Sequence, residues 1–136
     1  MVTLTLPPTV DSVSAILDAV ERWAEAQDVP PGVAHRLGVV MEELAANVAM
    51  HGTRGAGGAT FVTVTVARDG NAILATVEDD GRAFDPLDQA APDLEAALEA
   101  REVGGLGVHF ARRMTRELRY VRDAGRNRVT AVFDAG

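Results

Sequence analysis

Four short segments in which apolar and polar residues alternate constrain the fold of this chain more than any other feature. They cover residues 61–66, 72–77, 118–122 and 128–133. An Asp-Gly pair lies between the first two and an Ala-Gly-Arg-Asn turn lies between the last two, which is typical of two β-hairpins. Because side chains alternate between the two faces of a strand, this pattern predicts an antiparallel sheet that is covered on one face.

The segments outside the hairpins predict one more strand and three helices. Residues 2–6 alternate and end at Pro7, which indicates a short strand. Apolar residues recur at spacings of three and four over about 10–27 and 31–51, and a third helix is expected over about 106–116. This order of elements predicts an α+β fold, a two-layer α/β sandwich whose mostly antiparallel sheet carries its helices on one face.

Composition agrees with a single compact unit. The chain has 136 residues, 47% of them hydrophobic, which suits one domain over 1–136 with a sizeable core. Five large side chains have spacings that place them in this core: Trp23, Met41, Met50, Phe110 and Met114.

Several classes of protein are excluded by what the chain lacks. It has no cysteine, so disulfides, zinc fingers and thiol chemistry are ruled out. The sequence contains no long apolar run and begins without a basic region or cleavage site, so neither a membrane helix nor a signal peptide is expected. A net charge of −7 argues against nucleic-acid binding through overall charge. We therefore expect a cytoplasmic protein that binds neither nucleic acid nor membrane.

All 13 basic residues are arginine, and this has two consequences. Without lysine there is no P-loop, so a nucleotide would have to be bound in another way. Seven of the arginines lie within residues 112–128, where only two residues are acidic. Such an asymmetry marks either a docking face or an ordinary solvated surface, and the second interpretation is favoured.

The second predicted helix carries three polar residues at intervals of four, Glu43, Asn47 and His51. This spacing places them on one stripe of the helix, beside its apolar face. A carboxylate can accept a proton and an Asn carbonyl can bind Mg²⁺, so the first two suit phosphoryl transfer. A polar stripe facing water explains the same spacing, and taken alone the segment favours that simpler interpretation.

Two further segments carry residues suited to a ligand, and each also has an ordinary structural explanation. Asp79 and Asp80 end an apolar strand and Gly81 follows, so a carboxylate at the rim of the sheet could accept an exocyclic amine. A plain Asp-Gly turn has the same sequence. Residues 104–107, Gly-Gly-Leu-Gly, precede the third helix, where glycines let a phosphate approach free backbone N–H groups. A hinge or a helix cap would explain them equally well.

Taken together, the order and spacing of these segments resemble the histidine-kinase-like (GHKL) ATPase superfamily. The N box of that superfamily is matched by Glu43 to Asn47, and the first glycine box by Asp79 to Gly81. The second glycine box is matched within residues 104–107. The resemblance covers nearly the whole chain and implies the Bergerat-type ATP-binding fold, which agrees with the order of elements.

Within the superfamily, four segments are similar to the anti-sigma factors and switch-protein serine kinases of bacterial partner-switching systems: residues 47–52, 84–86, 104–109 and 120–127. The resemblance implies an ATP-binding anti-sigma regulatory factor and serine/threonine-protein kinase. It would phosphorylate a STAS-domain anti-sigma factor antagonist and sequester a sigma factor or another regulator. The alternative is an ATP-binding interaction module without kinase activity that acts only by sequestering its partner. Homodimerisation through the first helix and the N-terminal strand is a further implication.

The resemblance also assigns roles to individual residues. Glu43 would be the general base, Asn47 would bind the Mg²⁺ that bridges the ATP phosphates, and Asp79 would accept the adenine amino group. Gly81 would let the base lie close to the chain, and residues 86–103 would form the ATP lid. The residues implied at the phosphates are Gly104, Gly105, Leu106 and Gly107, with Gly104 also acting as a hinge.

The chain departs from the family pattern at two positions. Ala83 stands where the first glycine box often has its second glycine, a change that nucleotide binding tolerates unless the position needs a positive φ. Val103 stands where some members carry a basic residue, which leaves Arg101 as the nearest arginine for the γ-phosphate. Both departures favour the alternative without kinase activity. Glu42 could replace Glu43 as the base, but the four-residue spacing to Asn47 favours Glu43.

Overall fold

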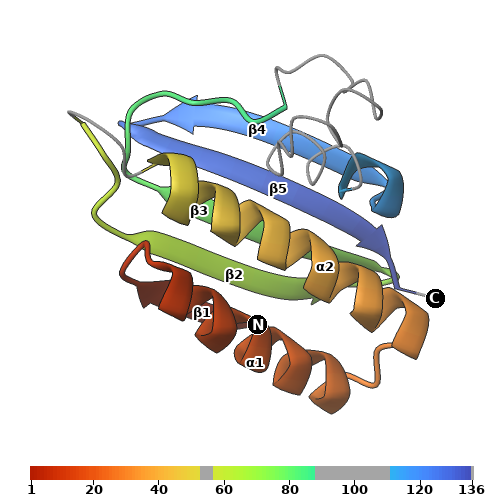
Figure 1. Cartoon of the computed structure of the whole chain (residues 1–136). Helices are drawn as coiled ribbons and strands as arrows, with labels where there is room; N and C mark the ends of the chain where they lie inside the picture. Colours follow the sequence, from red (N-terminus) through yellow and green to blue (C-terminus); the bar gives the residue numbers. More distant parts are fainter. Residues whose placement is uncertain (53–56, 88–110, 136) are drawn as a thin grey trace, which may run out of the picture.

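The computed structural model describes residues 1–52, 57–87 and 111–135. Figure 1 shows two layers, with the two long helices lying across one face of a sheet. The elements are β1 (Val2–Leu6), α1 (Val10–Ala26), α2 (Pro31–Asn47), the π-helical turn η1 (Val48–Gly52), β2 (Val62–Asp69), β3 (Ala72–Asp79), β4 (Glu117–Asp123) and β5 (Arg126–Asp134). The predicted α+β sandwich is confirmed.

The sheet has five strands in the order β1-β2-β3-β5-β4, and all four pairings between them are antiparallel. Both predicted hairpins are present, β2 with β3 and β4 with β5. The pairing of β3 with β5 sets Asp79 opposite Asn127. The C-terminal end of β3 therefore lies beside the beginning of β5, although 48 positions separate these two residues in the chain.

The core lies between the sheet and the helices. Ile16 and Val20 of α1 and Leu37, Val40 and Met41 of α2 are buried there. Strands β2 and β3 alternate between buried and half-buried residues, as the sequence pattern predicts. Fully burying a large aliphatic side chain contributes about 1.5–3 kcal/mol, so this layer contact accounts for much of the stability.

Local signals begin the helices and close the hairpins. The Thr9 side chain accepts a hydrogen bond from the Ser12 N–H at 3.3 Å and caps α1, while Pro31 occupies the start of α2. In the second hairpin, Ala124 and Gly125 have φ values of 51° and 78°. Two consecutive positive φ angles match the right-handed twist of the strands, which explains why the turn is tight.

The structure corrects the second predicted helix. Its α-helical part ends at Asn47 and a π-helical turn follows, so the regular four-residue stripe does not extend from Asn47 to His51. Met50 lies in this turn and is 44% exposed, so its assignment to the core was wrong. Of the third predicted helix, residues 111–114 are helical with Ala111 fully buried, while 106–110, including Phe110, lie outside the described residues.

Candidate functional site

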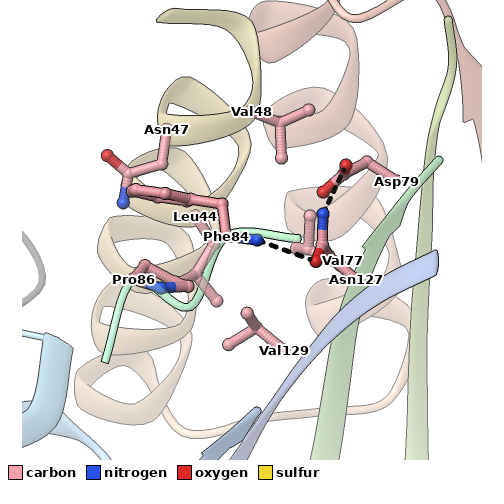
Figure 2. Close-up of a pocket in the computed structure, with 9 residues that line it drawn as sticks. All are labelled: Leu44, Asn47, Val48, Val77, Asp79, Phe84, Pro86, Asn127 and Val129. Carbon is pink, nitrogen blue, oxygen red and sulfur yellow. Dashed lines mark hydrogen bonds between the residues drawn. The ribbon is translucent and has the colours of Figure 1, made fainter. Parts of the chain in front are cut away.

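A pocket opens where the end of α2 meets the adjacent ends of β3 and β5. Figure 2 shows two walls, one from the helix and one from the strands, with the segment from Phe84 to Pro86 between them. The helix wall consists of Leu44, Asn47 and Val48. The strand wall consists of Val77, Asp79, Asn127 and Val129. The pocket therefore joins the predicted N box to the predicted first glycine box.

The Asp79 carboxylate forms the polar centre of the strand wall. Asp79 is only 6% exposed, and its Oδ1 accepts hydrogen bonds from the Gly81 N–H at 2.9 Å and from Asn127 Nδ2 at 3.1 Å. Within the described part of the chain, no donor lies on Oδ2. A buried carboxylate with one oxygen held and one oxygen open suits a ligand that offers an N–H donor.

Asn127 holds this wall together. It is 4% exposed, and besides Asp79 its amide nitrogen donates to the Arg82 carbonyl at 2.8 Å. Its Oδ1 accepts from the Tyr120 hydroxyl at 2.6 Å and from the Phe84 N–H at 3.2 Å. Burial raises the pKa of Tyr120, which keeps its hydroxyl protonated and able to donate. One side chain thus joins β4, β5 and the segment after β3.

Arg122 adds a second tie between the closing hairpin and the first glycine box. Its Nη1 donates to the Gly81 carbonyl at 2.7 Å and to Asn127 Oδ1 at 3.1 Å. Sequence reasoning did not single out Asn127 or Arg122 as site residues. The closing hairpin was noted for its family resemblance, but only the β3–β5 register shows that it reaches Asp79.

Asn47 is the last residue of α2 and lies at the helix wall (Figure 2). It is 9% exposed, and its side-chain amide has no hydrogen-bond partner within residues 1–52, 57–87 and 111–135. An amide oxygen is a good ligand for Mg²⁺, which usually keeps several water or phosphate ligands. The same described ranges contain no group of three or more His, Asp or Glu side chains that could hold a metal ion alone. Asn47 therefore fits as a single protein ligand to an ion that a phosphate chain also binds.

Glu43 lies one helical turn before Asn47 and is half-buried. Burial raises its pKa, and the adjacent Glu42 carboxylate raises it further. A carboxylate with a raised pKa holds a proton more readily, which favours general-base chemistry near neutral pH. Glu42, the alternative base, is exposed and lines a groove between α1 and α2, and Glu43 is not among the residues that line that groove. This separation agrees with the preference for Glu43.

The pocket is nearly closed in this structure. Its cavity has a volume of about 30 Å³, room for about one or two water molecules. A purine ring would fit the apolar side chains of Leu44, Val77 and Val129, but it would enter only if the segment from Phe84 to Pro86 moved outward. The Asp79 carboxylate can accept a hydrogen bond from the amino group of adenine and the apolar side chains can contact its ring, but the cavity must widen before the ring can enter.

The other predicted site residues fall into two groups. Gly81 is buried beside Asp79, and Ala83 is exposed nearby. Ala83 is not among the described residues with positive φ, so this position does not require glycine. The remaining predicted site residues, Arg101, Gly104, Gly105, Leu106 and Gly107, lie outside the described residues, as does the part of the predicted lid from 88 to 103.

The arginine-rich stretch is largely engaged within the chain. Arg126 and Arg128 both contact Glu78 at 3.1 Å, and Arg116 contacts Asp134 at 3.2 Å. Further partners are Glu117 for Arg119 and the Leu87 carbonyl for Arg112. These contacts favour the interpretation as an ordinary surface. A search of the described helices finds no segment long and apolar enough to cross a membrane.

Comparisons with known proteins agree with this geometry. A family model described as the histidine kinase-like ATPase domain matches residues 6–133. No curated protein sequence matches the chain. The RsbU and RsbW domain structure from Mycobacterium tuberculosis has a TM-score of 0.68 at 16% identity, over 98% of this chain and 31% of that one.

Two other solved structures share the fold. The SiaB–SiaC complex from Pseudomonas aeruginosa has a TM-score of 0.69 at 17% identity, covering 98% of this chain and 89% of the matched one. The blue-light activated histidine kinase of Erythrobacter litoralis has a TM-score of 0.60 at 22% identity, over 79% of this chain and 32% of that one. At these identities the likeness shows the fold alone.

Proposed function

Because the chain belongs to the family of histidine kinase-like ATPase domains, we propose that the pocket beside Asp79 binds ATP together with Mg²⁺. The observation that carries this proposal is the half-satisfied carboxylate of Asp79, whose Oδ2 can accept the exocyclic amine of adenine. Asn47 supplies an amide oxygen at the opposite wall, where an ion bound to the phosphates would lie. The predicted phosphate-binding loop, residues 104–107, completes the proposed site.

We further propose that the protein is a serine/threonine-protein kinase of a bacterial partner-switching system and works in the cytoplasm. Its substrate would be a STAS-domain anti-sigma factor antagonist, and it would sequester a sigma factor or another regulator. Half-buried Glu43, with its raised pKa and its position one turn before Asn47, supports the kinase activity. The Pseudomonas structure is a complex of two named components, which is the setting that partner switching requires.

In this mechanism the chain positions the reactants and moves one proton. Glu43 would accept the proton of a Ser or Thr hydroxyl while that oxygen bonds to the γ-phosphorus. The bond from the γ-phosphorus to the bridging oxygen breaks, and ADP leaves with its electron pair. When bound, Mg²⁺ would neutralise the charge of the phosphates. Asp79 and Asn127 would hold the base at the strand wall.

The test compares two adjacent carboxylates. We expect Glu43→Gln to lower phosphate transfer from radiolabelled ATP to the cognate STAS-domain protein by at least about 100-fold, since general-base catalysis contributes roughly 10²–10⁴. Affinity for ATP should not change. The matched variant Glu42→Gln should retain transfer. Equal transfer by wild type and Glu43→Gln would refute the assignment of the base.

The same assay tests the alternative function. Mg²⁺-dependent ATP binding without transfer to any STAS-domain partner, in wild-type protein, would favour an interaction module that acts only by sequestration. Val103, at a position where some family members carry a basic residue, motivates this alternative. Ala83 no longer does so, because its backbone conformation is open to alanine.

A further inference from the structure

A second and larger concavity lies between α1 and α2, away from the nucleotide pocket. We call it the outer groove and define it by Leu17 and Ala24 of α1 together with Ala34, Gly38 and Val39 of α2. Its volume is about 670 Å³, against about 30 Å³ for the nucleotide pocket. Its lining residues run from Leu17 to Glu25 of α1 and from Pro31 to Glu42 of α2, so at 1.5 Å per residue the groove follows the helices for about 12–17 Å.

Gly38 gives the outer groove its depth at the middle of α2. A glycine inside a helix costs about 0.5–1 kcal/mol relative to alanine. A Cβ atom added at Gly38 would meet nothing within 4 Å, so packing within the described chain does not require glycine there. A glycine at the floor of a groove lets another molecule approach the helix backbone closely.

The rim of the outer groove is acidic. Glu21 and Glu25 of α1 and Glu42 of α2 line it, and all three are exposed. None of these carboxylates has an ion-pair partner within residues 1–52, 57–87 and 111–135. Glu78 on the sheet, in contrast, contacts two arginines. The groove, which His35 also lines, therefore combines an apolar floor with three carboxylates that no ion pair among the described residues balances.

We propose that the outer groove is a docking surface for a basic amphipathic α-helix of a partner protein. A third helix fits between two antiparallel helices, as ridges of side chains fit into grooves. Its apolar face would lie over Gly38 and Leu17, and its Lys or Arg residues would pair with Glu21, Glu25 and Glu42. The proposal deepens the sequestration part of the proposed function and needs neither ATP nor kinase activity.

The test uses two synthetic 18-residue helical peptides with the same leucine and alanine face, flanked in one peptide by lysine and in the other by glutamate. Fluorescence anisotropy of the labelled peptides on the full chain measures binding. We expect a Kd below about 100 μM for the lysine peptide and at least tenfold weaker binding of the glutamate peptide. Raising the salt concentration from 50 to 500 mM should weaken binding of the lysine peptide. No binding of the lysine peptide, or equal binding of both, would overturn the proposal.

Two variants locate the peptide in the groove. Gly38→Leu fills the floor of the groove and should weaken binding of the lysine peptide at least tenfold. Gly38→Ala should weaken binding less and should raise the stability of the helix. Glu21→Lys with Glu25→Lys should abolish binding. The matched control, Asp69→Lys with Asp123→Lys, makes the same change in charge in the two hairpins and should retain most of it. Binding that survives Gly38→Leu would show that the peptide attaches elsewhere and would refute the groove.

Folding and nucleotide binding are followed separately. The single tryptophan, Trp23 of α1, is buried in the core, so its fluorescence during urea unfolding reports whether each variant is folded. The variant Asp79→Asn should still bind the lysine peptide, and its affinity for ATP should fall. Loss of ATP binding in the wild type would refute the proposed nucleotide site, while the peptide result would still decide the groove.

Discussion

The two walls of the proposed nucleotide pocket differ in how hydrogen bonds hold them. On the strand wall, Asp79 and Asn127 bond to each other, and Gly81 and Tyr120 complete the network. On the helix wall, Asn47 ends α2 with a side-chain amide that has no partner in the described part of the chain. The strands present a fixed acceptor, and the helix presents an accessible amide to the pocket.

This difference suggests a division of work. A network of short hydrogen bonds holds a carboxylate in one orientation, which favours recognition of one base edge. The accessible Asn47 amide can bind a ligand without first breaking a hydrogen bond within the described part of the chain. We therefore expect the strand wall to determine which base binds, and the helix wall to gain order only when Mg²⁺ and the phosphates are present.

The largest effect on ATP binding is expected at Asp79. Asp79→Asn replaces one of two accepting carboxylate oxygens with an NH₂ group, which cannot accept a hydrogen bond from adenine. We expect ATP affinity to fall about 30- to 150-fold, the equivalent of about 2–3 kcal/mol. Isothermal titration with ATP and Mg²⁺ measures it. Asp80→Asn is the matched control, because Asp80 contacts Thr60 and Phe61 rather than the pocket. Similar losses in both variants would contradict a specific role for Asp79.

Asn127→Ala tests whether the strand wall is held in advance. The change removes the hydrogen bonds that Asn127 makes to Asp79, to the Arg82 carbonyl and to the Tyr120 hydroxyl, so we expect the free energy of unfolding to fall by about 2–4 kcal/mol. Urea unfolding followed by Trp23 fluorescence measures this. The exposed residue Asn71 offers the control Asn71→Ala, for which we expect a change below about 0.5 kcal/mol.

Asn47→Ala should give the opposite pattern. Its amide has no partner within the described residues, so the free energy of unfolding should change by less than about 1 kcal/mol. The affinity for Mg-ATP should fall about tenfold, while the weaker affinity measured in EDTA should be unchanged. If Asn47→Ala weakened binding equally with and without Mg²⁺, the residue would act on the nucleotide rather than through the ion.

The smallest effect is expected from the charge beside the proposed base. Transfer requires ionised Glu43, so its rate should rise as the pH increases through the raised pKa of that carboxyl. Glu42→Gln removes one of the two causes of that rise, and the acid limb of the pH–rate profile should therefore shift to lower pH. A profile that does not move would show that burial alone sets the pKa of Glu43, or that another group is the base.

Most of the fold could be predicted from the sequence because its signals are local. The alternation in β2 and β3 and the turn at Ala124-Gly125 act over a few residues each, and both lie where the pattern places them. The end of α2 could not be predicted in this way. Residues 48–52 continue the apolar spacing of a helix, but the structure widens them into a π-helical turn and exposes Met50.

The site was predicted in part for the same reason. Asn47 and Asp79 stand in short motifs, and the structure brings both to one pocket. Asn127 stands in a hairpin whose sequence carries no sign of what it contacts. Its importance depends on the register of β3 against β5, which joins residues far apart in the chain.

The sequence by itself determined the order of the described helices and strands and the two hairpins, and it predicted that Asn47 and Asp79 belong to a ligand site. Periodicity, capping and turn chemistry depend on neighbouring residues, so they can be predicted from the sequence. The tertiary structure alone decided that Asn127 holds Asp79, that Glu42 lines the groove between α1 and α2, and that Gly38 lies in the same groove. Those facts arise when distant segments pack together, because strand register and helix packing bring into contact groups that the linear order keeps apart.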